Sequence, residues 1–187
     1  MQVAGLVLAA GAGRRYGMPK ALVAYRGDLL VRRAAAVLSE SRCVSVLVVV
    51  GAQAPQVRAA APELAYLENP DWDSGMGSSL RAGLAALAGT PADAVVVLLV
   101  DMPGVTSAAV RRIAAFAGPE ALVMGGYGDR RGHPVLIGRA HFDGVAAAAT
   151  GDRGARDYLR AHDVRLVDVG DVADDFDLDV PVEPADA

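Results

Sequence analysis

The residues best suited to chemistry form one glycine-rich segment with three basic side chains. Residues 8–20 read Leu-Ala-Ala-Gly-Ala-Gly-Arg-Arg-Tyr-Gly-Met-Pro-Lys and continue an apolar run from Val3 to Ala9. Glycines let a backbone approach a ligand closely, and successive backbone N–H groups form a concave anion site. The segment therefore predicts a polyphosphate-binding loop that contains Gly11, Gly13, Gly17, Arg14, Arg15 and Lys20.

The spacing of this loop excludes two common phosphate-binding motifs. A P-loop needs Gly-x-x-x-x-Gly-Lys-Ser/Thr, but Lys20 follows Pro19 and precedes Ala21. A dinucleotide fingerprint needs Gly-x-Gly-x-x-Gly, and the third glycine here comes one residue too late. The second predicted strand also ends in Gly51-Ala52-Gln53, without the acid that would hold a ribose hydroxyl. The plain alternative is a solvated glycine-rich turn.

Two further polar segments follow predicted strands. Asp71–Ser79 comes after the third strand, and Asp101 ends the apolar run Val95–Val100. Ligands of open α/β sheets bind outside the carboxyl ends of the strands, so these segments and the glycine loop should meet at one edge. A carboxylate at the end of an apolar strand, beside a phosphate-binding loop, suits a magnesium ligand. The structural alternative is a turn aspartate ahead of Pro103.

Short apolar runs alternate with helical stretches, which predicts an α/β fold with a largely parallel central sheet. The expected strands are 3–9, 44–50, 65–68, 94–100, 121–125, 135–137 and 165–169. The expected helices are 28–39, 55–61, 78–88, 107–117, 139–150 and 155–162. The glycine-rich, charged segment 125–132 is expected to be a mobile loop over the site. No repeat or linker interrupts the 187 residues, which predicts one domain.

Composition limits the partners and the compartment. The formal net charge of −4 disfavours non-specific binding to nucleic acid. The apolar runs are far shorter than the ~20 residues of a membrane helix, and Met1-Gln2-Val3 lacks the basic start of a signal peptide. The only cysteine, Cys43, excludes an internal disulfide and is expected to be a buried thiol. We therefore expect a cytoplasmic protein without membrane or nucleic-acid partners.

Six motifs occur in an order that resembles one enzyme family. Beyond residues 8–20 they are Asn69–Leu80, Val100–Pro103, Gly132–Val135, Gly151–Arg156 and Asp177–Pro181. Together they span nearly the whole chain and resemble the MobA-like nucleotidyltransferases, most closely the molybdenum cofactor cytidylyltransferase branch. Two residues depart from the family pattern: Tyr16 stands where Met is usual, and Val180 replaces Thr in the final Asp-Thr-Pro motif.

The resemblance implies a three-layer Rossmann-like nucleotidyltransferase fold. Residues 1–104 would form the NTP-binding half and residues 105–187 the acceptor-binding half of the single domain. The implied reaction is Mg²⁺-dependent transfer of CMP from CTP to a phosphorylated acceptor, with release of pyrophosphate. The acceptor that the resemblance favours is molybdenum-bearing molybdopterin, with a client molybdoenzyme as a further partner.

The resemblance also assigns roles to individual residues. Asp101 is the principal Mg²⁺ ligand and Asp179 the second, with Asp177 as the alternative in a tail that could otherwise be a solvated acidic face. Arg15 and Lys20 are expected to act with Asp101 in catalysis, because their charges can neutralise the departing pyrophosphate. The expected nucleotide-binding residues are Leu8, Ala9, Ala10, Gly11, Gly13, Gly17, Lys20, Gly77, Ser79 and Asp101. His133, Arg153 and Arg156 are expected on the acceptor side.

Several functional alternatives stay open. Guanylyl-transferring relatives tend to have glycine at the position of Ala10, so Ala10 and Ser79 favour CTP, and a GTP-using guanylyltransferase is the alternative. An NAD(P)H-dependent reductase that uses the same cleft would be identified by hydride oxidation. A non-catalytic cofactor carrier or chaperone is the third class, and Lys20, Asp101 and Asp179 argue against it because they favour turnover.

Overall fold

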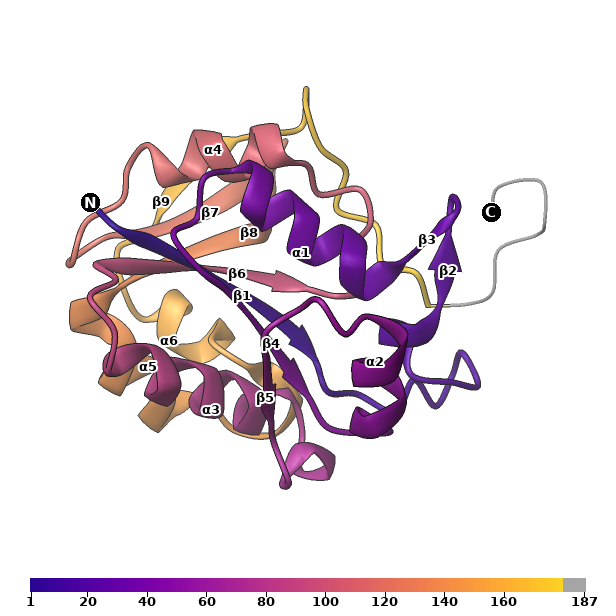
Figure 1. Ribbon diagram of the computed structural model, residues 1–187. Helices are drawn as coiled ribbons and strands as arrows, with labels where there is room; N and C mark the ends of the chain where they lie inside the picture. Colours follow the sequence, from indigo (N-terminus) through magenta and orange to yellow (C-terminus); the bar gives the residue numbers. More distant parts are fainter. Residues whose placement is uncertain (180–187) are drawn as a thin grey trace.

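The computed structural model describes residues 1–179, and its centre is a seven-stranded sheet in the order β5-β4-β1-β6-β8-β7-β9 (Figure 1). The two pairs that β8 makes are antiparallel, and every other neighbouring pair of this sheet is parallel. A small hairpin of β2 (Ala24–Tyr25) and β3 (Asp28–Leu29) lies outside it. The seven strands are β1 (Val3–Ala9), β4 (Val46–Val50), β5 (Tyr66–Glu68), β6 (Ala94–Leu99), β7 (Leu122–Tyr127), β8 (Arg130–Gly138) and β9 (Arg165–Asp168).

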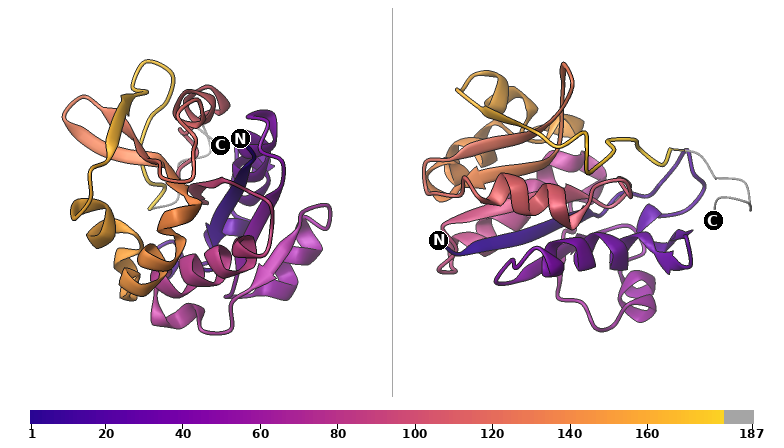
Figure 2. Two further views of the ribbon diagram at one scale, coloured as in Figure 1. Left: turned by 90° about the vertical axis from the view of Figure 1, so that its left-hand side faces the viewer. Right: turned by 90° about the horizontal axis from the view of Figure 1, so that it is seen from above.

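Helices cover both faces of the sheet. One face carries α1 (Leu30–Glu40) and α4 (Ser107–Ala114), and the other carries α3 (Met76–Ala88), α5 (Phe142–Ala148) and α6 (Arg156–Arg160) (Figures 1 and 2). The short α2 (Ala54–Ala60) packs beside the 3₁₀ turn η1 (Lys20–Leu22). These three layers confirm the expected α/β fold with its largely parallel sheet. No helix within residues 1–179 is long and apolar enough to cross a membrane.

The central strands are apolar along their length because helices cover both of their faces. In β1 six of the seven residues are buried, and in β6 five of the six. One apolar cluster, which includes Leu38 and Ile113, lies under α1 and α4. A second cluster, which includes Leu84 and Phe142, lies under α3 and α5. The sheet therefore holds the strand ends, and the loops that leave them, in fixed positions.

The loops after β1, β5 and β6 leave the sheet at one edge. The backbone N–H of Val100 donates to the carbonyl of Leu8 (3.1 Å), and that of Asn69 donates to Val50 (2.8 Å). Because β8 runs opposite to its neighbours, its amino end and the β7–β8 turn lie at the same edge. The geometry thus brings together segments that are far apart in the sequence.

The residues that follow β9 return across this edge. The backbone N–H of Asp174 donates to Gly104 (3.0 Å), and the N–H of Leu178 donates to the carbonyl of Asp101 (2.9 Å). Arg130 of β8 pairs with Asp175 at 2.9 Å, and Leu178 is buried. These contacts place Asp179 beside the end of β6. Val180, one of the two departures from the family pattern, lies outside the described residues.

Two sequence-based expectations need correction. Residues 125–132 do not form a free loop, because β7 continues to Tyr127 and β8 starts at Arg130, which makes them a tight hairpin. A Cβ on Gly132 would lie 2.9 Å from the Tyr127 ring, so this glycine serves packing rather than mobility. The expected helix 139–150 divides into the 3₁₀ turn η3 (Arg139–His141) and α5.

Candidate active site

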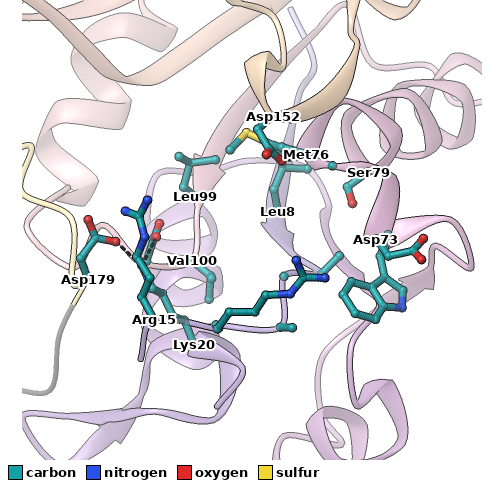
Figure 3. Close-up of a pocket in the computed structure, with 18 residues that line it drawn as sticks. Leu8, Arg15, Lys20, Asp73, Met76, Ser79, Leu99, Val100, Asp152 and Asp179 are labelled. Carbon is teal, nitrogen blue, oxygen red and sulfur yellow. Dashed lines mark hydrogen bonds and ion pairs between the residues drawn. The ribbon is translucent and has the colours of Figure 1, made fainter. Parts of the chain in front are cut away.

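A cleft of about 370 Å³, here called the first cleft, opens at the carboxyl edge of the sheet. Figure 3 shows Lys20 and Asp179 toward one side, Ser79 and Asp73 toward the other, and Leu8 and Leu99 between them. The first cleft therefore has a charged end and an opposite end lined by Ser79 and Asp73, with apolar side chains between them. Its lining consists of Leu8, Ala10, Gly11–Arg15, Lys20, Trp72, Asp73, Gly75, Met76, Ser79, Leu99, Val100, Asp101, Asp152 and Asp179.

The glycine loop wraps one wall of the first cleft. Gly13 has a φ of +61°, and a Cβ there would lie 1.8 Å from the carbonyl oxygen of Met18, so only glycine fits. The carbonyl of Gly13 accepts from the N–H of Gly17 at 2.8 Å, which closes the turn. The turn leaves Arg14 and Arg15 lining the cleft. This geometry suits the polyphosphate that the sequence predicts.

Lys20 lies between two carboxylates at the charged end. Its ammonium donates to Asp101 Oδ2 at 2.7 Å and to Asp179 Oδ1 at 2.9 Å. Burial lowers the pKa of Lys20, but the hydrogen bonds and charges of the two aspartates outweigh it, so the pKa is raised above its ordinary value. The same hydrogen bond lowers the pKa of Asp179. Lys20 and Asp179 are therefore charged at neutral pH.

The same two carboxylates fit a divalent cation, because they are already arranged around a positive charge. Within residues 1–179, no group of three or more His, Cys, Asp or Glu side chains is placed to hold a metal. Two carboxylates nevertheless suit Mg²⁺ or Mn²⁺, since such ions commonly take further ligands from substrate phosphates and water. Asp177, the alternative ligand, lines a different cleft. Burial and the charges of Asp101 and Asp179 raise its pKa.

A buried network of hydrogen bonds forms the opposite end of the first cleft. The side-chain amide of Asn69 donates to Ser78 Oγ at 2.8 Å and to Ser79 Oγ at 3.0 Å. All three side chains are almost completely buried, and Ser79 lines the cleft whereas Ser78 does not. Ala10 and the indole of Trp72 complete this end.

A second cleft of about 480 Å³ adjoins the first, and the two share Leu8, Met76, Leu99 and Asp152. Its floor is apolar, and arginines stand along its rim. The floor includes Leu80, Val97, Met124, Val135, Ile137 and Leu159, and the rim includes Arg130, Arg131, Arg153, Arg156 and Arg160. An apolar floor with a cationic rim suits an anionic ligand with a large organic body.

His133 lines the second cleft in its neutral form. Burial lowers its pKa to about 4, and the charge of Asp101 opposes this shift. A neutral imidazole can donate one hydrogen bond and accept another, so His133 suits contact with a polar ligand rather than with an anion alone.

The structure brings most of the predicted site residues together. Leu8, Ala10, Gly11, Gly13, Arg15, Lys20, Ser79, Asp101 and Asp179 line the first cleft, and His133, Arg153 and Arg156 line the second. Three predicted nucleotide-binding residues do not line the first cleft. Ala9 is buried within the sheet, and Gly17 donates its N–H to Gly13 within the loop. Gly77 packs against the backbone of Ala149, which a Cβ on Gly77 would approach to 2.8 Å.

Sequence reasoning missed several residues that line or support the clefts. Asn69 and Trp72 belong to the motif Asn69-Pro70-Asp71-Trp72, so the motif held the signal, but their roles depend on contacts that only the fold shows. Asp152 lines both clefts. Arg130 and Arg131 fell in the segment expected to be a loop, and their place on the rim follows from the β7–β8 hairpin.

Comparisons with known proteins identify the family of the chain. Residues 5–166 match the MobA-like NTP transferase domain. The molybdenum cofactor guanylyltransferase of Rhodobacter capsulatus is 35% identical over 127 residues, which cover 67% of this chain and 64% of that protein. The nicotine blue oxidoreductase of Paenarthrobacter nicotinovorans is 40% identical over 189 residues, 95% of this chain and 92% of that protein.

Solved structures share the fold over almost the whole chain. The crystal structure of Rv0371c from Mycobacterium tuberculosis superposes with a TM-score of 0.80 and 32% identity, and covers 96% of this chain and 93% of that one. A structure of the same protein in complex with manganese gives a TM-score of 0.78 and 31% identity, with coverage of 95% and 94%.

Proposed function

The chain belongs to the MobA-like NTP transferase family, and on that basis we propose that it transfers CMP from CTP to a phosphorylated acceptor and releases pyrophosphate. The observation that carries the proposal is the charged end of the first cleft. There, a glycine loop presents Arg15 and Lys20 in the same cleft as Asp101 and Asp179. This set provides the cations that a triphosphate needs and the carboxylates that a divalent ion needs.

Asp101 and Asp179 are the proposed ligands of Mg²⁺. A divalent ion bound there would neutralise charge on the phosphates and orient them for in-line attack. Related Rv0371c has been crystallised with manganese, which supports a divalent site in this family. Lys20 would interact with the oxygen that bridges the α- and β-phosphates, where negative charge grows as pyrophosphate departs. Arg15 would hold the β- and γ-phosphates.

The acceptor provides its own nucleophile. A phosphate oxygen of the acceptor is already anionic, so attack on the α-phosphorus needs no strong general base. Positioning and charge neutralisation supply most of the rate in such reactions. The residues of the first cleft therefore act by holding the triphosphate and its charge in place.

Ala10 and Ser79 are the proposed determinants of the base. The methyl group of Ala10 reduces the space for a purine, and the Ser79 hydroxyl offers a hydrogen bond to a pyrimidine. Each such contact is worth roughly 1–3 kcal/mol of discrimination. We expect Ala10→Gly to let GTP compete, and Ser79→Ala to weaken CTP without improving GTP.

The second cleft is the proposed acceptor site. Arg153 and Arg156 would hold the phosphate of the acceptor, and the apolar floor would accommodate its organic body. Molybdenum-bearing molybdopterin fits this description, and its product would pass to a client molybdoenzyme in the cytoplasm. The proposed division of the chain is an NTP-binding half, residues 1–104, and an acceptor-binding half, residues 105–187.

Pyrophosphate release tests the proposal. The purified protein is incubated with Mg²⁺ and each of the four NTPs, with and without molybdopterin. We expect release with CTP only when molybdopterin is present. Preference for GTP would assign the protein to guanylyl transfer, and no release with any nucleotide would overturn nucleotidyl transfer.

A second candidate is an NAD(P)H-dependent reductase, which the 40% identity to nicotine blue oxidoreductase favours. A dinucleotide also presents a pyrophosphate that the glycine loop can hold. However, β4 is followed by Gly51-Ala52-Gln53, which offers no acid to a ribose hydroxyl. Oxidation of NADH or NADPH, with a quinone-type dye as electron acceptor, distinguishes the two functions. The loss of the absorbance of the reduced nicotinamide measures this oxidation.

A further inference from the structure

We infer that Asn69 is a positioning residue that fixes the hydrogen-bond polarity of Ser79, so that Ser79 offers the nucleobase a donor and not an acceptor. The inference rests on the proposed function, because it assigns the base to the end of the first cleft that Ser79 lines. It predicts that the bound base presents an acceptor atom to Ser79.

The orientation of the Asn69 amide is set by the backbone. Asn69 Oδ1 accepts from the N–H of Asp71 at 3.0 Å, and an N–H group can only donate. The Nδ2 group must therefore point the other way, toward the two serines. This group donates to Ser78 Oγ and to Ser79 Oγ, with Nδ2–Oγ distances of 2.8 Å and 3.0 Å. Both hydroxyls are thereby made acceptors toward Asn69.

The two serines differ in where their own hydrogens go. The Ser78 hydroxyl has two carbonyl acceptors within reach, those of Gly75 (2.8 Å) and Asp71 (2.9 Å), so its one hydrogen stays within the protein. Among residues 1–179, the Ser79 hydroxyl makes one hydrogen bond, the one it accepts from Asn69, and it donates none. Ser79 also lines the first cleft, so its hydrogen is left to point into that cleft. Asn69 thus turns a hydroxyl that could adopt either role into a dedicated donor.

This polarity restricts the base. Cytosine presents O2 and N3 as acceptors on the edge that carries its amino group, and Ser79 can donate to either. A base that turned an N–H toward Ser79 would leave two donors facing each other in a buried site, which is unfavourable. Asn69 acts on this choice without touching the base.

The test reverses the polarity with one atom. In Asn69→Asp the carboxylate still accepts from Asp71, but it can no longer donate, so Ser79 must donate to it. Ser79 then presents only lone pairs to the cleft. We expect the Kd of Mg²⁺–CTP to rise about tenfold or more, while the Kd of tripolyphosphate, which has no base, stays the same. Trp72 is the only tryptophan and lines the cleft, so its fluorescence reports both titrations.

The control is Thr90→Ala. The Thr90 hydroxyl donates to the carbonyl of Leu87 (2.7 Å) just beyond the end of α3 and lines neither cleft, so its removal should leave both Kd values unchanged. A second comparison repeats Asn69→Asp in a Ser79→Ala background, where the effect on CTP should disappear because the group that Asn69 orients is gone. If Asn69→Asp does not fold, Asn69→Ala takes its place in the same cycle, with a smaller loss expected.

The outcomes separate the inference from the proposed function. Unchanged CTP binding in Asn69→Asp, or an equal loss in the Ser79→Ala background, overturns the role of Asn69 while nucleotide binding stands. Failure of the wild-type protein to bind either CTP or tripolyphosphate overturns the proposed function itself. A loss for CTP alone, abolished in the Ser79→Ala background, supports the inference.

Discussion

At the scale of single residues, Lys20 lies between Asp101 and Asp179, the two proposed ligands of a divalent cation. Its ammonium offsets the repulsion between Asp101 and Asp179, to which it lies within 2.9 Å. If both carboxylates bind a divalent ion, as we propose, the ion would displace this ammonium, which would then be available to a phosphate. Lys20 and the ion would then compete for the same two side chains.

The competition makes a prediction for Lys20→Met. Loss of the ammonium should tighten Mn²⁺ binding in the absence of nucleotide by about tenfold, as expected for removal of a charge-assisted pair. The same variant should lower kcat more than it raises the KM for CTP, since charge on the leaving group exists mainly in the transition state. Electron paramagnetic resonance of free Mn²⁺ and steady-state kinetics provide the two measurements.

Arg58→Met is the control for this experiment. It removes an exposed ion pair with Glu68 (3.1 Å), and such pairs contribute little, so neither Mn²⁺ affinity nor kcat should change. Unchanged Mn²⁺ affinity in Lys20→Met contradicts the competition. A change confined to KM makes Lys20 a binding residue only.

Asp101→Ala should abolish transfer while the fold survives. The carboxylate is a proposed metal ligand, and its loss removes several kcal/mol of charge stabilisation, or about a thousandfold or more in rate. Asp101 lies just beyond the end of β6 and is partly exposed, so its loss should not disrupt the core. Pyrophosphate release and circular dichroism measure the two effects, with the exposed Asp163→Ala as control. Near wild-type transfer by the folded variant would remove Asp101 from the metal site.

His133 predicts how stability depends on pH. Its pKa is lowered from 6.5 to about 4 by burial, so between these values the unfolded chain takes up a proton that the folded chain does not. The free energy of unfolding should therefore fall as the pH drops through this window, by up to about 1.4 kcal/mol per pH unit from this group. Urea unfolding at pH 7 and pH 5 should show a shallower dependence in His133→Gln than in the wild type. The exposed His162→Gln should leave it unaltered, and equal dependence in all three proteins contradicts the assignment.

Motif order found the charged residues of the site but not the contacts among them. Lys20, Asp101 and Asp179 could be named from the sequence because each stands in a short pattern. Their meeting could not be derived, since Lys20 and Asp179 are 159 residues apart and depend on the segment after β9 that crosses the edge. Asn69 could not be assigned because its role lies in the direction of one amide, which only the bond from Asp71 reveals.

At the scale of elements, the glycine loop allows a graded test of backbone geometry. Gly11 has open space and an ordinary φ, Gly17 has a φ of +93° and open space, and Gly13 has both a φ of +61° and a clash with Met18. Alanine should therefore cost little stability at Gly11, about 1–2 kcal/mol at Gly17 and more at Gly13. Urea unfolding of the three variants measures this order. Equal stabilities would mean that the loop is not held in this conformation.

The strands and helices followed from the sequence more closely than the hairpin did. Continuous apolar runs such as β1 and β6 are typical of strands covered on both faces, and their bounds were predicted within one residue. The β7–β8 hairpin was mistaken for a loop because glycine and charge are turn signals. Its glycines instead leave space for neighbouring side chains. A Cβ on Gly125 would contact Val169, and a Cβ on Gly132 would contact Tyr127. Such packing between distant segments cannot be predicted from local composition.

At the scale of the whole molecule, the two clefts adjoin each other. They share four lining residues, among them Leu8 at the end of β1 and Asp152 of the 3₁₀ turn η4 (Gly151–Arg153). A nucleotide in the first cleft and an acceptor in the second would meet directly, so the transfer needs no covalent enzyme intermediate. We therefore expect both substrates to be bound together before pyrophosphate leaves.

Arg156→Ala tests this division of labour between the clefts. Arg156 is exposed on the rim of the second cleft and is not part of the first. If it holds the phosphate of the acceptor, its loss should raise the KM for molybdopterin about tenfold, the scale of one charge-assisted hydrogen bond. The Kd of CTP, read from Trp72 fluorescence, should not change. Arg111→Ala, which removes an exposed arginine of α4 on the other face of the sheet, should alter neither value. A weaker affinity for CTP with an unchanged KM for the acceptor would contradict the prediction, because it would assign CTP to the second cleft.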